Sequence, residues 1–390
     1  MSCFVDTSFD SLKKKGEELC GDMVEIIKVE DSTVIVLADG LGSGVKANIL
    51  ATLTSRIAAT MIKGGADIYE TVHTIVNTLP ICSERHIAYS TFTIMKIQRD
   101  GRTYAVEYEN PPFFLIRKGE SIKVERKETI INGRKILESN FSLQEEDVIT
   151  IISDGVLHAG EGNVLNMGWQ WSDVESYLLR SSGNKRCAKN ISRDLIDACW
   201  YLYGCKPGDD ATAIGIKIKR PQYVDLFTGP PEHKEKDAYV INELMRGKGK
   251  KIICGGTAAN IAERILKRSL VVDAKDINSE IPPIFYMDGV DLITEGVITL
   301  SKTIEIIREY ADSFLEEGRE NSLKGEDGAI RLAKILLEEC THLNLWVGKA
   351  WNKAYDKEEF YLSIGIKMRL VEELCQFMQR LGRIVKINYV

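Results

Sequence analysis

The stretch Ala38-Asp39-Gly40-Leu41-Gly42-Ser43-Gly44 is central to the fold, because an acidic residue at a strand end is followed by a glycine-rich turn. Residues 33–38 are mostly apolar and favour a strand, and residues 45–61 carry apolar side chains at helical spacing. The glycines permit positive φ angles and close approach of the backbone to a ligand. The stretch therefore predicts a strand, an acidic turn and a helix, with the Asp39 carboxylate and nearby carbonyls available to one ligand.

A predicted hairpin brings a second aspartate to Asp39. Alternating apolar residues run from Asp22 to Val29 and from Ser32 to Ala38, on either side of a two-residue turn at Glu30-Asp31. Counting outward from this turn sets Asp22 directly opposite Asp39. Opposed Cβ atoms lie about 4.5 to 5.5 Å apart in an antiparallel pair. Two carboxylates at that distance repel each other unless a cation lies between them.

Further aspartates lie beside glycine at two other predicted strand ends. The apolar strand at 148–153 leads into Asp154-Gly155, and Gly208-Asp209-Asp210 precedes the strand at 211–218. If these strands are antiparallel neighbours, the end of one meets the start of the other. Asp-Gly pairs are also common in ordinary turns, so a structural role for each pair stays open. Taken together, the pairs indicate one acidic site.

Such a set of carboxylates suits divalent cations. Hard cations prefer oxygen ligands, and Mg²⁺ keeps several waters while taking one or two carboxylates. Four aspartates and a glycine carbonyl would suit two Mg²⁺ or Mn²⁺ ions roughly 3.5 to 4 Å apart. Ions at this spacing activate water and clamp a phosphate, so we expect hydrolysis of a phosphate ester.

In order and spacing, four motifs resemble those of the metal-dependent serine/threonine protein phosphatases of type 2C. The resemblance is to the bacterial branch of stage II sporulation and stress-response phosphatases, and it covers about residues 1–220. It implies an α+β fold in which two packed antiparallel sheets are flanked by helices, an αββα sandwich with a dinuclear metal site at one end. The motifs are Gly21-Asp22, Ala38 to Gly44, Ser153-Asp154-Gly155-Val156 and Gly208-Asp209-Asp210-Ala211-Thr212.

The resemblance also implies roles for individual residues. Asp39 would bridge the two ions, Mn²⁺ or Mg²⁺, and Asp39 and Asp22 would be the residues most important for catalysis. The implied substrate is a phosphoserine or phosphothreonine protein, in this branch often a small regulator similar to an anti-sigma-factor antagonist. The implied metal ligands are Asp22, Asp39, the Gly40 carbonyl, Asp154 and Asp209, with Asp210 second to Asp209.

Two weaker candidates stand apart from this set. His158, which follows Asp154 closely, is a candidate general acid, although a loop histidine is also compatible with a structural role. Gly255-Gly256-Thr257 links a predicted strand at 251–254 to a helix with Thr257 as N-cap, and such a helix start would suit an anion. The segment lacks the lysine of a P-loop, so an ordinary structural turn is the alternative.

The length of the chain predicts two domains. Its 390 residues exceed one ordinary core, and we expect a phosphatase domain over 1–220, a linker at 221–236 and a helix-rich mixed α/β domain over 237–390. For the last we expect a regulatory or partner-binding role. Within the two domains, we predict one strand at 128–138 and an acidic turn at 288–291.

Composition limits the class of partner. A net charge of −6 argues against nucleic acid or an anionic membrane as the main partner. No run approaches the roughly 20 apolar residues of a membrane span. The nine cysteines are scattered and never form a CxxC pair, which fits a reducing compartment. We expect a cytoplasmic protein, and its oligomeric state stays open.

Two other functions also stay open. One is a scaffold that binds a phosphoprotein without turnover, although the intact set of mutually repelling carboxylates argues against it. The other is a metabolite or nucleotide sensor in the C-terminal domain, centred on residues 252–260.

Overall fold

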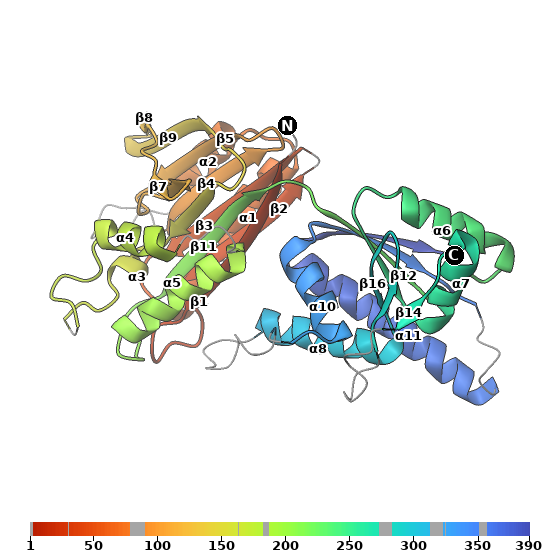
Figure 1. The fold of residues 1–390 in the computed structure, drawn as a ribbon. Coiled ribbons are helices and arrows are strands. Elements are labelled where there is room, and N and C mark those ends of the chain that lie inside the picture. The colour runs from red at the N-terminus through yellow and green to blue at the C-terminus, as the bar shows by residue number, and fades with distance from the viewer. Residues whose placement is uncertain are drawn as a thin grey trace. The chain divides into compact units, whose positions relative to one another are not determined.

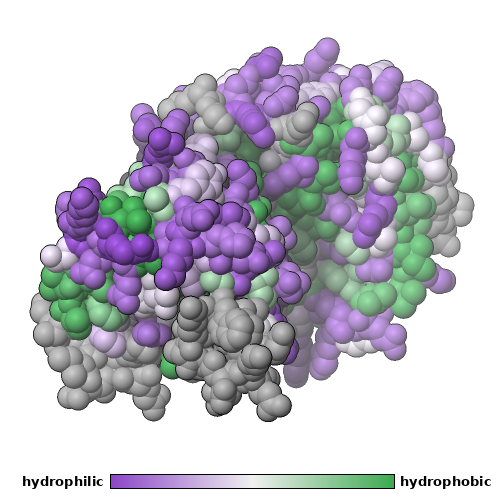
Figure 2. Space-filling model, turned by 90° about the vertical axis from the view of Figure 1, so that its right-hand side faces the viewer, coloured by the Kyte–Doolittle hydropathy of each residue, from purple (hydrophilic) through white to green (hydrophobic). Residues whose placement is uncertain are grey.

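The computed structural model describes residues 3–29, 31–78, 90–162, 164–181, 187–272, 283–312, 323, 325–350 and 357–390 (Figure 1). The chain divides into two compact units, Met1–Arg220 and Pro221–Val390. Within the described ranges, no helix combines the length and apolar character that crossing a membrane requires. The surface seen in Figure 2 is largely hydrophilic, with hydrophobic areas between the hydrophilic ones.

The first unit contains two antiparallel sheets, with strand orders β2-β3-β4-β5-β9-β8 and β1-β11-β10-β6-β7. Between them lies an aliphatic core to which the first sheet contributes Ile35 and Leu37 and the second Ile149 and Ile214. The strands are β1 (Phe4–Leu12), β2 (Asp22–Val29), β3 (Ser32–Gly40), β4 (Ser90–Gln98), β5 (Arg102–Tyr108), β6 (Phe114–Arg117), β7 (Glu120–Ser121), β8 (Lys127–Ile131), β9 (Arg134–Ser142), β10 (Val148–Ile152) and β11 (Ala211–Lys219).

Helices cover the outer face of each sheet (Figure 1). The helices α1 (Gly44–Lys63) and α2 (Ile68–Thr78) share a core with strands β3 and β4. The helices α4 (Trp171–Ser181) and α5 (Ala188–Leu202) share another core with β10 and β11, and the short α3 (Asp154–Leu157) follows β10. The predicted α+β class and its αββα sandwich are therefore confirmed.

The second unit is built on a mixed sheet of order β14-β15-β16-β13-β12-β17-β18. The strands from β16 to β18 in this order are parallel, and β14 and β15 add antiparallel pairs at one edge. The parallel strands have the 3-2-1-4-5 order of a doubly wound α/β fold. The strands are β12 (Tyr223–Thr228), β13 (Lys250–Cys254), β14 (Val271–Val272), β15 (Phe285–Met287), β16 (Val290–Thr294), β17 (His342–Val347) and β18 (Ile384–Tyr389).

Helices lie on both faces of this sheet (Figure 1). A 3-10 turn (Lys234–Lys236) leads into α6 (Asp237–Arg246), which shares a core with α7 (Gly256–Leu266) on one face. On the other face a second core joins α8 (Val297–Asp312), α10 (Gly328–Lys334) with its π-helical continuation Ile335–Glu339, and α11 (Lys357–Arg380).

The structure corrects three sequence predictions. Residues 221–236 are not simply a linker, because they contain β12, which is hydrogen-bonded on both sides and buried from Val224 to Thr228. Of the acidic turn expected at 288–291, only Asp288 and Gly289 form a turn, because Val290 and Asp291 already belong to strand β16. The single strand expected at 128–138 is a hairpin of β8 and β9 that turns at Asn132-Gly133, both with positive φ, as Asn-Gly hairpin turns require.

Candidate metal centre

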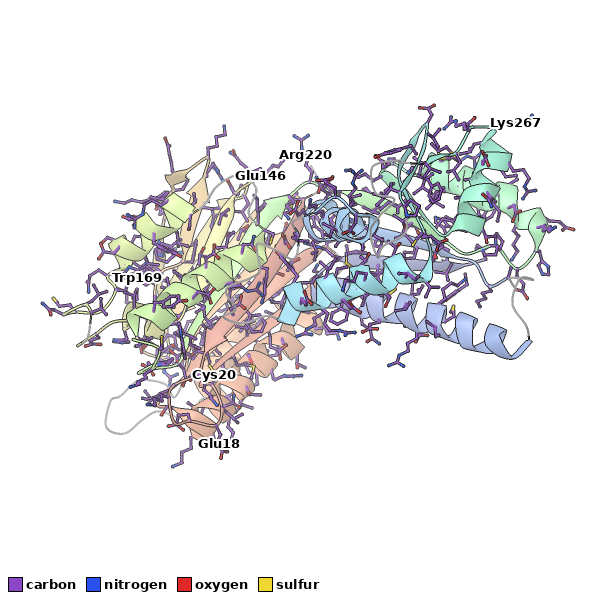
Figure 3. The ribbon with its side chains drawn as sticks, turned by 60° about the horizontal axis from the view of Figure 1, so that its bottom comes forward. Glu18, Cys20, Glu146, Trp169, Arg220 and Lys267 are labelled. Carbon is purple, nitrogen blue, oxygen red and sulfur yellow. The ribbon has the colours of Figure 1, made fainter. Side chains whose placement is uncertain are left out.

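The acidic residues lie at the ends of strands, and these strand ends meet at one end of the first unit. Antiparallel pairing sets Ile152 of β10 beside Ala213 of β11. The residues after β10 and those before β11 therefore lie together, as predicted for Asp154 and the pair Asp209-Asp210. In Figure 3, Cys20 marks the end with the site and Arg220 the opposite end of the unit.

The hairpin of β2 and β3 places Asp22 directly opposite Asp39. The strands pair without interruption from there to Val29 and Ser32. The register predicted by counting from the turn is thus confirmed, although Glu30 of that turn lies outside the described residues.

Ser153 connects this hairpin to the other sheet. Its hydroxyl donates to Asp22 Oδ2 at 2.7 Å and accepts from the backbone N–H of Thr212 at 2.9 Å. All three residues are buried. One hydroxyl therefore fixes the orientation of the Asp22 carboxylate relative to both β10 and β11.

Two glycines allow the acidic segments to approach closely. A Cβ added at Gly155 would lie 1.9 Å from the Asp210 carbonyl oxygen, and one added at Gly40 would lie 2.0 Å from the Ala47 carbonyl oxygen. Because Cβ atoms are never found that close to backbone oxygens, only glycine permits this packing of α3 on β11 and of β3 on α1.

Asp209 and Asp210 have different surroundings. Asp210 is buried, and its Oδ1 accepts from the backbone N–H of Lys14 at 3.0 Å. Asp209 is half-buried, accepts from the Asp210 N–H at 3.0 Å, and has its Oδ1 4.0 Å from Lys14 Nζ. The segment around Lys14 thus contacts both aspartates, which the sequence alone did not indicate.

The carboxylates raise one another's proton affinity. Burial raises the pKa of Asp22 to about 7, and the charges of Asp210 and Asp154 add to it, against hydrogen bonds from Thr212 and Ser153. Burial and the charges of Asp22 and Asp154 hold the pKa of Asp39 well above its usual range. The pKa of Asp209 is also raised, first by burial and then by Asp154. Carboxyl groups packed in this way favour a bound cation.

The donor atoms fit a divalent metal ion. Asp22 Oδ1 and Asp210 Oδ2 are buried and have no hydrogen-bond partner among the described residues. Asp154, His158 and Asp209 each offer one ligand atom within 4.8 Å of the others. Buried carboxylate oxygens without donors are costly unless a cation satisfies them, and hard cations prefer such oxygens.

The two weaker candidates lie in different places. His158 caps the C-terminus of α3 beside Asp154 and Asp209, and its Nδ1 lies 2.9 Å from Glu161 Oε2. Gly255-Gly256-Thr257 lies in the second unit, where Gly255 rather than Thr257 is the N-cap of α7. A carboxylate oxygen of Glu295 lies 3.8 Å from the Cβ position of Gly256, which disfavours an anion there.

Sequence reasoning gave no role to Ser153, Thr212 or Lys14. Ser153 lies within the Asp154 motif and Thr212 within the Asp209 motif. Their positions in these motifs are the sequence signal that could have identified them as site residues. Lys14 contacts Asp210 across 196 residues and lies in no motif.

One comparison with known proteins concerns the sequence of the first unit. Residues 30–219, just under half of the chain, match the sequence model of the family described as Stage II sporulation protein E (SpoIIE). The resemblance predicted from the acidic motifs is therefore confirmed, and the first unit is similar to phosphatase domains of this kind. The comparison with curated proteins found no match.

Several solved structures are also similar. The phosphatase domain of SpoIIE from Bacillus subtilis has 21% identity and a TM-score of 0.43, over 56% of this chain and 94% of that one. A second structure, with a fragment of the regulatory domain, has 22% identity and a TM-score of 0.47, over 56% and 64%. The RsbU and RsbW domains of a Mycobacterium tuberculosis protein have 16% identity and a TM-score of 0.49, over 62% and 67%.

Proposed function

We propose that the first unit is a metal-dependent protein phosphatase that hydrolyses phosphoserine or phosphothreonine. The observation that carries the proposal is the convergence of aspartates from both sheets, with raised pKa values and unpartnered buried oxygens. The family match over residues 30–219 supports the same activity. The proposed ligands are Asp22, Asp39, the Gly40 carbonyl, Asp154 and Asp209, with Asp210 in support.

Two divalent cations, Mg²⁺ or Mn²⁺, would supply activated water and neutralise the substrate phosphate. The chain prepares their site, because Ser153 holds Asp22 Oδ2 and leaves Oδ1 without a donor among the described residues. Asp39 stands opposite Asp22 and would hold the ions together with it.

Two side chains at the rim suit the substrate. Lys14 brings a positive charge to 4.0 Å from Asp209 Oδ1, where it favours approach of a phosphate. His158 lies beside Asp154 and Asp209 and is oriented by its 2.9 Å contact with Glu161. In the proposal, His158 protonates the departing serine or threonine oxygen.

The substrate we propose is a phosphorylated protein, such as a small regulator similar to an anti-sigma-factor antagonist. A protein substrate suits a site at an exposed strand end, where Asp154 and His158 are exposed. We assign the second unit to regulation or partner binding.

The direct test is a phosphatase assay on a phosphothreonine peptide. We expect release of phosphate that requires Mn²⁺ or Mg²⁺, stops in EDTA and returns when the metal is restored. Calorimetric titration with Mn²⁺ provides a readout independent of turnover. Activity that persists unchanged in EDTA, or metal binding without any hydrolysis of phosphopeptides, would contradict the proposal.

A further inference from the structure

A cavity of about 800 Å³ lies in the second unit beside α6. The strands β17 and β18 line it with one face only. Leu343 and Leu345 of β17, and Val385 and Ile387 of β18, pack into the core with α11. Because side chains alternate along a strand, the intervening residues point to the opposite face, toward the cavity. These are Asn344, Trp346, Lys386 and Asn388.

Side-chain hydrogen bonds link the floor of this cavity across neighbouring strands. Asp225 Oδ1 accepts from Asn344 Nδ2 at 2.8 Å, and Asn344 Oδ1 accepts from Asn388 Nδ2 at 2.6 Å. Asp225 Oδ2 accepts from Lys251 Nζ at 2.8 Å, and both side chains are 7% exposed. Parallel sheets normally carry aliphatic residues on both covered faces. This row of amides is therefore suited to a polar ligand rather than to a covering helix.

Aromatic side chains stand above the floor. The rings of Tyr239 and Trp346 meet edge to face, with centroids 6.2 Å apart. Tyr239 is 56% exposed, whereas Trp346 is buried and its Nε1 has no hydrogen-bond partner among the described residues. The ring that a ligand in the cavity can reach is therefore that of Tyr239, whose exposed side chain lines it.

The charges at the rim are mainly positive. Lys236 and Lys386 line the cavity, and Arg246 there is paired with Glu243. The charge of Asp225 is already balanced by Lys251. The uncompensated charge that remains favours an anion.

We infer that this cavity binds a nucleotide. Its base lies against Tyr239 and donates to the side-chain oxygen of Asn388, and its phosphates face Lys386. The volume falls within the roughly 300 to 1,000 Å³ of small-molecule sites. The position differs from the predicted sensor segment at 252–260.

The position also differs from the usual ligand crevice of doubly wound folds, which lies at the carboxyl ends of the strands. At the carboxyl ends of the parallel strands in this unit, the loops that follow β12 and β17 contact each other. Ala350 N donates to the Pro230 carbonyl at 3.0 Å, and a Cβ added at Gly348 would lie 2.1 Å from that carbonyl oxygen. The cavity on the sheet face is accordingly the better site.

The test is isothermal titration calorimetry of the full chain with ADP, GDP, CDP and UDP, and with adenosine and pyrophosphate. EDTA is present, so that phosphates cannot bind through cations at the acidic centre. We expect at least one nucleoside diphosphate to bind, and at least about tenfold more tightly than pyrophosphate, because the base adds contacts.

Two variants separate the parts of the ligand. Lys386→Glu should weaken binding of the diphosphate but not of the nucleoside, and Tyr239→Ala should weaken both. Both residues are exposed, so ligand-free thermal unfolding should match the wild type. Arg369→Glu, an exposed change on α11 at the other face, is the matched control and should bind normally.

Three outcomes would overturn the inference. One is no binding of any nucleoside diphosphate at millimolar concentration. Another is equal affinity for pyrophosphate and the best nucleotide, since the base would then contribute nothing. The third is unchanged affinity in both Lys386→Glu and Tyr239→Ala, which would place the ligand elsewhere.

Discussion

Buried carboxylates occur in both units, but they are balanced in different ways. In the second unit Asp225 has its own cation, because Lys251 of the neighbouring strand lies 2.8 Å away. In the first unit Asp22 and Asp39 face each other, and the pKa values of both are raised by burial and by further aspartates. A buried charge must be compensated. The second unit compensates Asp225 within the chain, whereas in our proposal metal ions take that role at Asp22 and Asp39.

This contrast separates folding from function. The pair of Asp225 and Lys251 needs no ligand. Its removal should therefore lower the free energy of unfolding. Without a bound cation, the mutually repelling carboxylates of the acidic centre destabilise the folded state. Removing one of them should therefore reduce phosphatase activity rather than stability. The following predictions test the contrast from its largest expected effect to its smallest.

Asp39→Asn should give the largest effect. We expect phosphatase activity to fall at least about 1,000-fold, because a bridging ligand should matter more than supporting residues, whose loss costs roughly 10- to 100-fold. In EDTA, the Tm of the variant should equal or exceed that of the wild type, since a repelling carboxylate is gone. Asp100→Asn, at an exposed turn, is the control. Activity retained in Asp39→Asn would refute the assignment.

Asp225→Ala should do the reverse. Removing one partner of a buried ion pair costs about 3 to 5 kcal/mol, because Lys251 is left buried and unpaired. Urea unfolding of the variant should show this loss in the second unit, with phosphatase activity of the folded protein unchanged. The double change with Lys251→Met should recover most of the loss. An equally unstable double variant would show that the pair is not the cause.

The pH dependence of stability in EDTA should reveal the acidic centre. Folded Asp22 keeps its proton up to about pH 7, whereas its ordinary pKa is 3.8. The folded state therefore binds more protons between these values, and stability should fall as pH rises through this window. Saturating Mn²⁺ should flatten the slope, and Asp22→Asn should reduce it. The measurement is the calorimetric Tm as a function of pH between 3.8 and about 7. If Asp22→Asn leaves the dependence of Tm on pH unchanged, Asp22 is not its cause.

Lys367 in the second unit should give a small effect of opposite sign. Burial lowers the pKa of Lys367 from 10.5 to about 8. The unfolded chain keeps this proton between those values while the folded chain releases it, so stability should rise with pH there. Lys367→Met should remove this contribution, and the difference in Tm between variant and wild type should narrow from pH 8 to pH 10. A constant difference would contradict the shift.

Sequence reasoning succeeded where local rules determine geometry. A two-residue turn fixes the register of a hairpin, so Asp22 opposite Asp39 followed from counting alone. It failed at β12, where Asp225 interrupts the apolar run and conceals a central strand beside a Pro-Gly segment. Two contacts of the site join residues that are far apart in the sequence. Ser153 and Asp22 are separated by 131 residues, and Lys14 and Asp210 by 196 residues, so no local sequence pattern predicts these contacts.

The acidic centre draws its residues from both layers of the sandwich. Asp22 and Asp39 belong to the six-stranded sheet, whereas Asp154, Asp209 and Asp210 flank strands of the five-stranded sheet. An ion held by both sets would act as a cross-link between the layers, in addition to the hydrogen bond from Ser153 to Asp22 and those from Asn110 to Thr93 and Ile152. Hydrogen exchange at this end of the sandwich should therefore slow when metal binds, and the enzyme's rigidity would depend on its cofactor as much as its chemistry does.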